Sequence, residues 1–253
     1  MMSSESAAKS PTIIVCDDAE AASLRAANLF AASISSWPDL ILGLATGGTP
    51  VAMYGHLVRM YNDGLLDFSQ IRTFNLDEYI GLAADHPQSY RSFMNQQLFD
   101  HVNLDPGNTF LPNGAASDVP AEVARYERLI ADSGGIELQL LGIGHNGHIA
   151  FNEPGSSRES RTRLVDLTPR TIESNARFFD SIDDVPKQAI TMGVETILEA
   201  KAIVLLAFGA AKADAVQKAI EGDVDASHPA SFLQTHRSVT YVLDREAASL
   251  LSS

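Results

Sequence analysis

Short, continuous apolar runs alternate with amphipathic helical segments along almost the whole of this 253-residue chain. Continuous apolar runs are typical of parallel strands that are covered by helices on both faces of a sheet. Each parallel strand must be reached from the previous one through a right-handed crossover, which usually contains a helix. The pattern therefore predicts an α/β fold, a Rossmann-like three-layer sandwich in which helices flank a mostly parallel central sheet.

The expected elements can be placed directly on the sequence. Strands are predicted at Thr12–Cys16, Leu40–Ala45, Ile71–Leu76, Ile136–Ile143, Lys201–Phe208 and Val239–Leu243. Helices are predicted at Ala19–Ser35, Val51–Asp63, Gln88–His101, Pro120–Asp132, Val194–Glu199, Ala211–Glu221 and Arg245–Leu251. No repeat, low-complexity block or linker divides the chain, so residues 1–253 are expected to form a single domain.

Residues 154–186 depart from this alternation. The segment is polar, rich in Arg, Ser and Thr, and has little core pattern. We interpret it either as a surface insertion or as a lid over the functional site, since both are typical of such segments.

The charge balance limits the partners of this protein. The chain has 32 acidic residues against 18 Lys and Arg, a formal net charge of −14. Nucleic acids are bound through clustered Lys and Arg, so no nucleic-acid partner is expected. A small phosphorylated ligand is compatible with this charge if a local cluster of donors holds it. Only five lysines are present, which makes any lysine near a glycine loop a candidate.

The N-terminal part of the chain and its cysteine content indicate a cytoplasmic protein. Cys16 is the only cysteine, so no internal disulfide can form, and its place in the run TIIVC predicts a small core residue. No apolar run reaches the roughly 20 residues of a membrane helix. The sequence MMSSESAAKS lacks the apolar stretch of a signal peptide, so neither secretion nor a membrane partner is expected.

Leu141–Glu153 is the strongest candidate for a functional site. Its sequence, LGIGHNGHIAFNE, ends an apolar strand in two glycines and continues at once with polar side chains. Loops at the carboxyl ends of parallel strands converge on one crevice, where ligands bind. His148 and Glu153 supply an imidazole and a carboxylate five residues apart, a pairing typical of acid–base catalysis. The stretch predicts an enzyme.

The same stretch does not predict a metal site. His145 and His148 have a spacing found at metal centres, but no cysteine accompanies them and the segment is a glycine-broken loop rather than a helix.

A second candidate site is the run Thr46-Gly47-Gly48-Thr49-Pro50, where a strand enters a glycine pair and then a helix. Backbone N–H groups and the helix dipole suit a phosphate there, although a tight turn at a helix start has the same sequence requirements. Lys212 stands at the start of a later helix, where the dipole disfavours a cation and a bound anion would remove the conflict. Arg177, followed by two aromatic residues, is a further candidate anion clamp.

Asp77 ends another predicted strand, so its carboxylate should project into the same crevice. The alternative for the Asp77–Glu78 pair is a solvated acidic loop or a helix cap. His86 precedes Pro87, which opens a helix at a favoured position, and is expected to be a surface loop residue.

Taken together, these segments resemble one family, glucosamine-6-phosphate deaminase, also called glucosamine-6-phosphate isomerase. The matching runs are LATGGTP, FNLDEYIGL with HPQSY, LGIGHNGHIAFNEPGSS, SRTR, NARFF and FGAAK, in the order of the family and from about residue 40 onward. The related 6-phosphogluconolactonases share the fold and a similar glycine-histidine loop, but the ending AFNEP favours the deaminase.

The resemblance implies an activity that needs no cofactor: glucosamine 6-phosphate and water give fructose 6-phosphate and ammonia, in amino sugar catabolism. The ring-opening acid–base of the family falls on His148, the base that moves the C2 proton to C1 on Asp77, and the carboxylate that orients the imidazole on Glu153. Asn146 stands where some members have Asp and others Asn. The phosphate-binding positions fall on Thr46, Gly47, Gly48, Thr49, Arg177 and Lys212.

One departure from the family concerns regulation. Regulated hexameric members bind N-acetylglucosamine 6-phosphate through a Ser, an Arg and a following Lys. Ser156 and Arg163 match, but Val165 replaces the Lys and Asp166 comes next. A carboxylate there repels a phosphate, and the chain ends soon after Leu251 without the longer tail of those members, so weak or absent activation is expected. Monomer and homo-oligomer both stay open.

Three alternatives to the deaminase remain. A 6-phosphogluconolactonase would use the phosphate loop and His148 but has no evident need for a proton shuttle at Asp77. A galactosamine-6-phosphate deaminase would differ in the stereochemistry at C4. A non-catalytic sugar-phosphate sensor is disfavoured, because the sequence has no helix-turn-helix appendage or basic patch and keeps a complete catalytic set.

Overall fold

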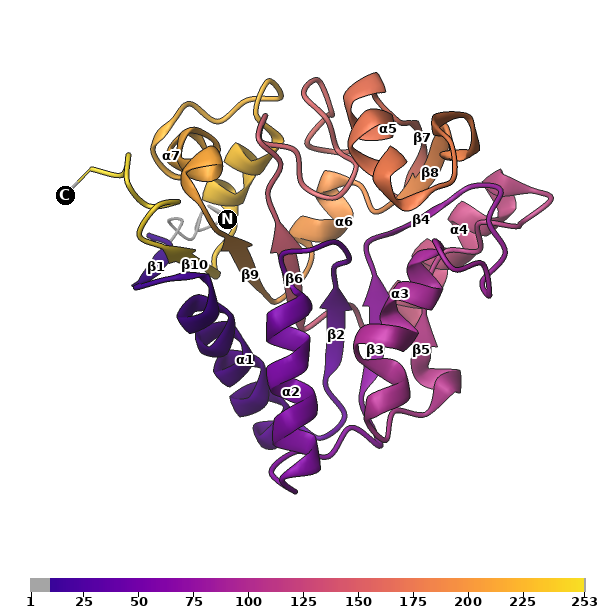
Figure 1. Cartoon of the computed structure of the whole chain (residues 1–253), viewed down its shortest axis with the longest axis horizontal. Coiled ribbons are helices and arrows are strands. Elements are labelled where there is room, and N and C mark those ends of the chain that lie inside the picture. Colours follow the sequence, from indigo (N-terminus) through magenta and orange to yellow (C-terminus); the bar gives the residue numbers. More distant parts are fainter. Residues whose placement is uncertain (1–9, 253) are drawn as a thin grey trace, which may run out of the picture.

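Seven parallel strands form the central sheet of the protein, whose structure, a computed structural model, describes residues 10–252 (Figure 1). Every pairing between neighbouring strands is parallel, which confirms the predicted sheet. Across the sheet the strands are β1 (Thr12–Cys16), β10 (Val239–Asp244), β9 (Ala202–Ala207), β6 (Leu138–Gly142), β2 (Ile41–Leu44), β3 (Arg72–Asn75) and β5 (Thr109–Phe110).

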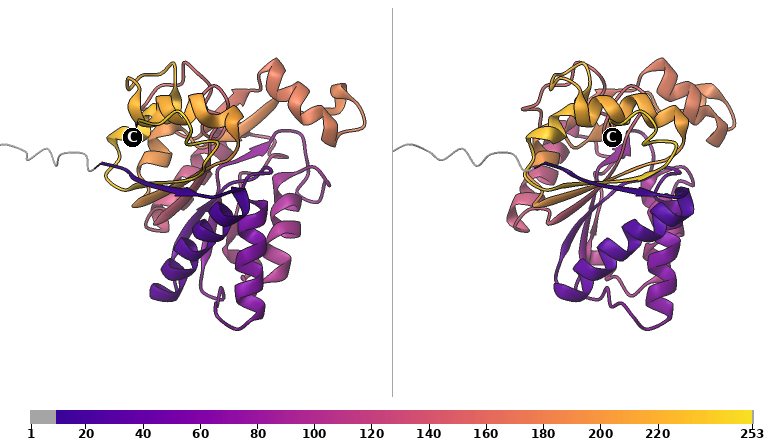
Figure 2. Two further views of the ribbon diagram at one scale, coloured as in Figure 1. Left: turned by 60° about the vertical axis from the view of Figure 1, so that its left-hand side comes forward. Right: turned by 90° about the vertical axis from the view of Figure 1, so that its left-hand side faces the viewer.

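Helices cover both faces of this sheet. The helices are α1 (Ala19–Ser36), α2 (Val51–Asn62), α3 (Tyr90–Gln97), α4 (Val119–Asp132), α6 (Val194–Leu198) and α7 (Ala213–Glu221). The connections that carry α1, α2 and α3 step one way along the sheet, and those that carry α4, α6 and α7 step back, so right-handed crossovers place the two groups on opposite faces. Figure 2 shows α1 and α2 on one side of the sheet and α7 on the other, which confirms the three-layer sandwich.

Local capping explains where several helices begin. Asp18, Ser89 and Asp118 each accept a hydrogen bond from the backbone N–H three residues further on, at the starts of α1, α3 and α4. Such caps satisfy one of the N–H groups that a helix start leaves without a partner inside the helix. These three helix starts lie within two residues of the predicted ones.

The predicted helix at Arg245–Leu251 is wrong. The carboxylate of Asp244 accepts hydrogen bonds from the backbone N–H groups of Gly209 and Ala247, and a series of turns follows instead of a helix. The bond from Ala247 is of the same kind as the caps at the starts of α1, α3 and α4, but here only turns follow it. The second partner of Asp244 comes from 35 residues away, so no local pattern could indicate it.

A small antiparallel sheet that the sequence did not predict lies above one side of the central sheet, at the upper right of Figure 1. Its strand order is β4 (Asp77–Tyr79), β8 (Gln188–Thr191) and β7 (Arg163–Asp166). The segment 154–186 supplies β7 and the helix α5 (Pro169–Asn175), and its Leu167 packs with Tyr79 and Ala189 in a second, smaller core. Buried apolar residues therefore occur in both halves of a segment whose sequence shows little core pattern, with Leu167 at 7% and Val185 at 1% exposure.

Strand β1 lies at the edge of the central sheet, which changes the expectation for Cys16. The cysteine is half-buried rather than fully buried, and burial raises the pKa of its thiol. Ile13 and Val15 on the same strand are exposed. Within residues 10–252, no helix combines the length and apolar character needed to cross a membrane.

Candidate active site

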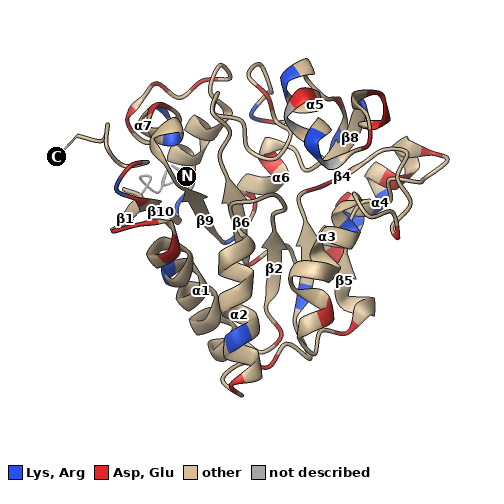
Figure 3. Cartoon of the chain, in the orientation of Figure 1, with Lys and Arg blue, Asp and Glu red and all other residues tan. Residues whose placement is uncertain are grey.

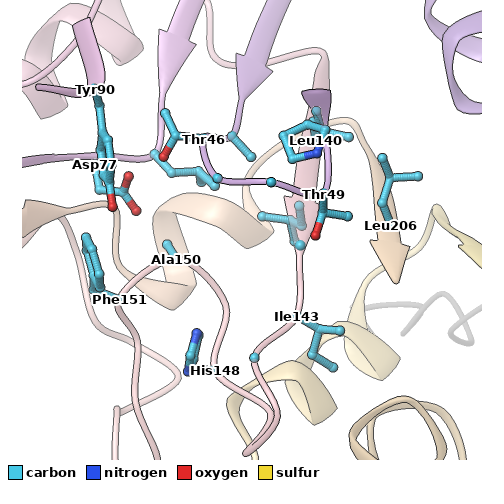
Figure 4. Close-up of a pocket in the computed structure, with 18 residues that line it drawn as sticks. Thr46, Thr49, Asp77, Tyr90, Leu140, Ile143, His148, Ala150, Phe151 and Leu206 are labelled. Atoms are coloured by element: carbon cyan, nitrogen blue, oxygen red, sulfur yellow. The ribbon is translucent and has the colours of Figure 1, made fainter. Parts of the chain in front are cut away.

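The carboxyl ends of β2, β3 and β6 converge on a cavity of about 200 Å³ (Figure 4). Main-chain segments at the ends of neighbouring strands meet here because parallel strands all point toward the same edge. The cavity is lined by Ala45–Pro50, Leu76, Asp77, Tyr90, Leu140–Gly144, His148, Ala150, Phe151 and Leu206. The predicted crevice is thus present, and it contains the glycine loop, Asp77 and His148 together.

Asp77 is the first residue of β4 and pairs with Thr191 of β8 in the small sheet. Asp77 is 6% exposed, and its carboxylate faces the cavity. Burial, together with the charge of Glu78, raises the pKa of Asp77 to about 8. A carboxyl group whose pKa lies near neutrality is suited to take up and return a proton.

Glu78 plays a different part from its neighbour. Its carboxylate accepts hydrogen bonds from the backbone N–H groups of Tyr79, Tyr90 and Arg91, and so caps the start of α3. The Asp77–Glu78 pair is therefore divided: one carboxylate lines the cavity and the other is a helix cap. The solvated acidic loop that the sequence left open is absent here, because both residues are buried.

His148 is held by two polar side chains of the same loop. Its Nδ1 lies 2.8 Å from Asn146 Oδ1 and 3.5 Å from Glu153 Oε1, and Asn146 Nδ2 donates to Glu153 Oε2 at 2.7 Å. With Asn146 oriented this way, Nδ1 of the neutral ring is the donor and Nε2 carries the lone pair. Asn146 thus makes the shorter contact with the imidazole, and Glu153 contacts both Asn146 and His148.

Glu153 is the charged member of this group. Half-burial raises its pKa, but hydrogen bonds from His148 and Asn146 outweigh burial and leave the pKa below its ordinary value. A carboxylate that stays ionised beside an imidazole stabilises the imidazolium that forms when the ring takes up a proton.

The glycine loop runs from the end of β2 into α2. Gly47 has a φ of +93°, a conformation that favours glycine. Tyr54 of α2 holds the start of the loop against this helix, because its hydroxyl donates a hydrogen bond to Ala45 O at 2.6 Å. The loop lies at the N-terminal end of α2, an arrangement that favours an anion.

Neither of the two predicted anion-binding cations lines the first cavity. Lys212, at the start of α7, is half-buried, donates from Nζ to Ile143 O at 2.7 Å, and has its pKa lowered by burial. Arg177 lines an adjoining cavity of about 460 Å³, which shares Gly47 and Gly48 with the first. Lys and Arg residues around α5 and β8 are interspersed with Asp and Glu residues (Figure 3).

Aromatic residues that the sequence did not single out surround Asp77. Tyr90 lines the cavity, and its ring lies 4.6 Å from that of Tyr79 and 6.3 Å from that of Phe151, between centroids. The Tyr79 hydroxyl accepts a hydrogen bond from Asn175 Nδ2 at 2.8 Å. All three rings fall within the runs FNLDEYIGL, HPQSY and LGIGHNGHIAFNEPGSS, so their position in those motifs was the only available signal.

The remaining histidines near the site differ from one another. His145 is exposed, lies perpendicular to His148 with 6.4 Å between ring centroids, and has its pKa lowered by burial and by Arg170. His86 lies in the loop before α3, is half-buried and stacks on Phe179. Among the side chains of residues 10–252, no three His, Cys, Asp or Glu come together as metal ligands would.

The residues compared with an allosteric site form a separate cavity of about 530 Å³. Arg163 donates to Asn152 Oδ1 at 2.8 Å and to Ser156 Oγ at 3.2 Å. Val165 and Asp166 line the same cavity, and the carboxylate of Asp166 accepts a hydrogen bond from Gln188.

Comparison with known proteins relates this site to one family. Residues 17–242 match the family described as glucosamine-6-phosphate isomerases/6-phosphogluconolactonase. The glucosamine-6-phosphate deaminase of Clostridium perfringens (strain SM101) is 54% identical over 239 residues, which cover 94% of this chain and 99% of that protein. The enzyme of the same name from Rhodopirellula baltica is 55% identical, over 94% of this chain and 95% of its own.

Solved structures agree with this relationship. A monomeric glucosamine-6-phosphate deaminase superposes with a TM-score of 0.92 at 50% identity, over 94% of this chain and 99% of that one. The 6-phosphogluconolactonase of Trypanosoma brucei superposes with a TM-score of 0.78 at 22% identity, a likeness of fold alone. The chain therefore belongs to the glucosamine-6-phosphate isomerase/6-phosphogluconolactonase family of enzymes.

Proposed function

We propose that this protein is a glucosamine-6-phosphate deaminase that acts in the cytoplasm, in the breakdown of amino sugars. The observation that carries the proposal is the placement of Asp77 and His148 around one cavity, with the glycine loop on its wall (Figure 4). A lactonase requires no carboxyl group that exchanges protons with carbon, whereas an aldose–ketose isomerisation does. The 54–55% identity to enzymes named glucosamine-6-phosphate deaminase supports the same assignment.

The reaction would begin with ring opening. The phosphate is held by the backbone of the glycine loop and by Lys212 and Arg177, which places the sugar in the cavity. His148 takes the proton of the C1 hydroxyl on Nε2 and gives a proton to the ring oxygen, so that the C1–O5 bond breaks and an aldehyde forms. Asn146 and Glu153 keep the imidazole in the required tautomer and stabilise its protonated form.

Isomerisation and deamination would follow at C1 and C2. The Asp77 carboxylate removes the proton from C2 and returns it to C1, while one proton passes from the ammonium group to the C1 oxygen. These transfers leave an iminium group at C2 and a hydroxyl group at C1. Water adds to the iminium carbon, and ammonia leaves to give fructose 6-phosphate. The ammonium group of the bound substrate favours the ionised form of Asp77, because an opposite charge nearby lowers the pKa of a carboxyl group.

The direct test is the stoichiometry of the reaction. Purified protein with glucosamine 6-phosphate should release ammonia and fructose 6-phosphate in equal amounts. Galactosamine 6-phosphate and 6-phosphogluconolactone, assayed in parallel, test the two enzymatic alternatives. Turnover of the lactone with no release of ammonia from either amino sugar would contradict the proposal.

We also propose that residues 154–186 act as a lid. The segment carries Arg177 to the cavity beside the glycine loop, and its Asn175 is bonded to Tyr79, two residues from Asp77. A lid in this position would exclude water when the phosphate is bound.

The increase of kcat/KM on the acid side of the pH profile, its acid limb, should reflect the ionisation of Asp77. Because the pKa of this carboxyl is raised to about 8, kcat/KM is expected to rise with pH up to about 8 as the base becomes ionised. The amine and phosphate of the substrate titrate in the same region, so a variant is needed to assign the limb. Glu78→Gln removes the charge that contributes to the raised pKa but keeps an acceptor for the cap, and should move the limb to lower pH. An unmoved limb would assign it to the substrate.

Of the two partners of His148, Glu153 is expected to matter more. Glu153→Gln removes the only negative charge in contact with the imidazole and should lower kcat/KM by about 100-fold, in the range of general acid–base effects. Asn146→Ala should cost several-fold at most, because the ring can then turn to bond Glu153 directly. Steady-state kinetics of both variants decide this, and the reverse order would refute the assignment.

Activation by N-acetylglucosamine 6-phosphate is expected to be weak or absent. Asp166 places a carboxylate in the cavity that holds Ser156 and Arg163, where it would repel a phosphate. Initial rates at subsaturating substrate should change little when the effector is added. A strong activation that Arg163→Ala abolishes would contradict this expectation.

A further inference from the structure

The segment Ala226–Ala230, which follows α7, is bonded to both ends of the loop that carries His148. The backbone N–H of Ala230 donates to Gly147 O at 2.8 Å, and that of Gly155 donates to Ala226 O at 2.7 Å. The catalytic loop is therefore held by a part of the chain that has no role in the chemistry proposed above.

His228 lies in the middle of this segment and is 8% exposed. Its Nε2 lies 2.9 Å from Ala215 O of α7, a carbonyl group that can only accept, so Nε2 carries the proton. Burial lowers the pKa of His228, which keeps the ring neutral near pH 7 with this one N–H committed to α7.

The other side of the His228 ring occupies the space beside Gly147. A Cβ atom at residue 147 would lie 2.2 Å from both Cε1 and Nδ1 of His228, far inside contact distance. Gly147 also has a φ of +83°. The imidazole thus packs directly on the backbone between Asn146 and His148 and limits how far that backbone can move toward α7.

We propose that His228 is a positioning residue for the catalytic loop. Its ring is fixed by α7 and supports Gly147, and through Gly147 it sets the placement of Asn146 and His148. The inference deepens the proposed deaminase function and rests on it for its kinetic consequences.

The hydrogen bond between His228 and Ala215 also connects two parts of the proposed site, the start of α7 and the loop that carries His148. Ala215, which anchors the ring, lies three residues after Lys212 on the same helix start. His228 therefore fixes the distance between the helix that bears a phosphate-binding cation and the loop that bears the ring-opening imidazole. Since a misplacement of about 1 Å can cost about 100-fold in rate, loss of this contact should lower kcat.

His236 provides a matched control for a substitution of His228. It is equally buried, at 8% exposure, and its Nε2 is bonded to a backbone carbonyl, Ala200 O, at 2.7 Å. Ala200 precedes β9, whose opposite end reaches the cavity at Leu206. Both substitutions to Ala remove a buried imidazole and its hydrogen bond to a backbone carbonyl, and His236→Ala also removes the bond that Nδ1 accepts from the backbone N–H of Ser238 at 3.1 Å. Only His228 lies beside the catalytic loop.

His228→Ala is expected to lower kcat about 10- to 100-fold while KM changes by less than about threefold, because the imidazole of His148 is displaced and the phosphate contacts remain. His236→Ala should leave kcat and KM near wild type even if both variants lose similar thermal stability. Equal kcat values for the two variants at matched folded fractions would overturn the proposal.

A second pair of variants tests the contact itself. Gly147→Ala forces a methyl group into the ring of His228 and should lower kcat strongly. Adding His228→Ala opens that space, so the double variant should have a higher kcat than Gly147→Ala alone, although Ala at a positive φ keeps some strain. A double variant no better than Gly147→Ala would show that the ring does not constrain residue 147.

Amide hydrogen exchange gives a readout that does not depend on the reaction. Backbone amides of residues 141–152 should exchange faster in His228→Ala than in the wild type, and their exchange rates should be unchanged in His236→Ala. If the wild type released no ammonia, the proposed function would fail while this measurement still judged the support by His228. If the wild type were active but His228→Ala matched it in kcat and exchange, the inference alone would fail.

Discussion

Asp77→Asn should abolish deamination almost completely, with kcat/KM reduced by about 10³- to 10⁴-fold, the upper range for loss of a general base. The amide is nearly the same size as the carboxyl group but cannot take the proton from C2. Ring opening at His148 should survive, so the variant is expected to bind substrate with nearly normal affinity. Steady-state kinetics with ammonia detection, and binding of substrate measured by calorimetry, check both statements.

The same substitution should stabilise the protein at neutral and alkaline pH. The folded-state pKa of Asp77 is raised from 3.8 to about 8, so between these values the folded state keeps a proton that the unfolded chain has lost. Stability therefore falls as pH rises through this window and levels off above about pH 8. Asn carries no such penalty, and its advantage should grow by up to about 1.4 kcal/mol per pH unit across the window.

These two effects of Asp77→Asn separate a catalytic role from damage to the fold. A variant that is inactive yet more stable at pH 8 than the wild type in urea unfolding has lost chemistry rather than structure. If the variant kept its activity, or lost stability in parallel with activity, the assignment of Asp77 as the proton shuttle would be wrong.

Lys212→Ala is expected to raise KM for glucosamine 6-phosphate by about 100-fold and to change kcat less, because a charge-assisted hydrogen bond to the phosphate is lost in both the bound and the transition state. In the structure the Lys212 ammonium is bonded to the backbone oxygen of Ile143, a residue that lines the cavity, although Lys212 itself is not a lining residue. The measurement is KM over a wide range of substrate concentration at constant ionic strength.

Lys218→Ala is the matched control for this second prediction. Lys218 lies on the same helix, six residues further on, and pairs with Asp214 in solvent, where a salt bridge has little effect. Its loss lowers the net positive charge of α7 by the same amount as the loss of Lys212. Similar KM values for the two variants would show a general electrostatic effect and refute a specific phosphate contact.

The alternation of apolar runs and helical patterns was sufficient to predict the central sheet and six of its strands. Burial on both faces leaves a signal in consecutive residues, and that signal does not depend on which strands become neighbours. The motif around His148 and the glycine loop could also be located, because each follows a predicted strand and ligands bind at the carboxyl ends of parallel strands. The glycine loop alone did not distinguish a phosphate site from a tight turn at a helix start.

The small antiparallel sheet, in contrast, could not be predicted from the sequence. Strands β4, β8 and β7 are three to four residues long and lack a local pattern, and they form because each pairs with a strand more than 20 residues away. The carboxylate of Asp244 is a further contact without a local signal, since one of its donors is the backbone N–H of Gly209, 35 residues earlier in the chain.

From the amino-acid pattern alone one can predict the type of fold, the edge of the sheet where a ligand is expected, and the residue types available there. The surroundings of each polar group follow from the folded arrangement: the burial that raises the pKa of Asp77, the hydrogen bond of Lys212 to Ile143, and the packing of His228 against Gly147. Periodicity reports burial along one element, whereas the solvation and partners of a polar side chain depend on residues that folding brings together from distant parts of the chain.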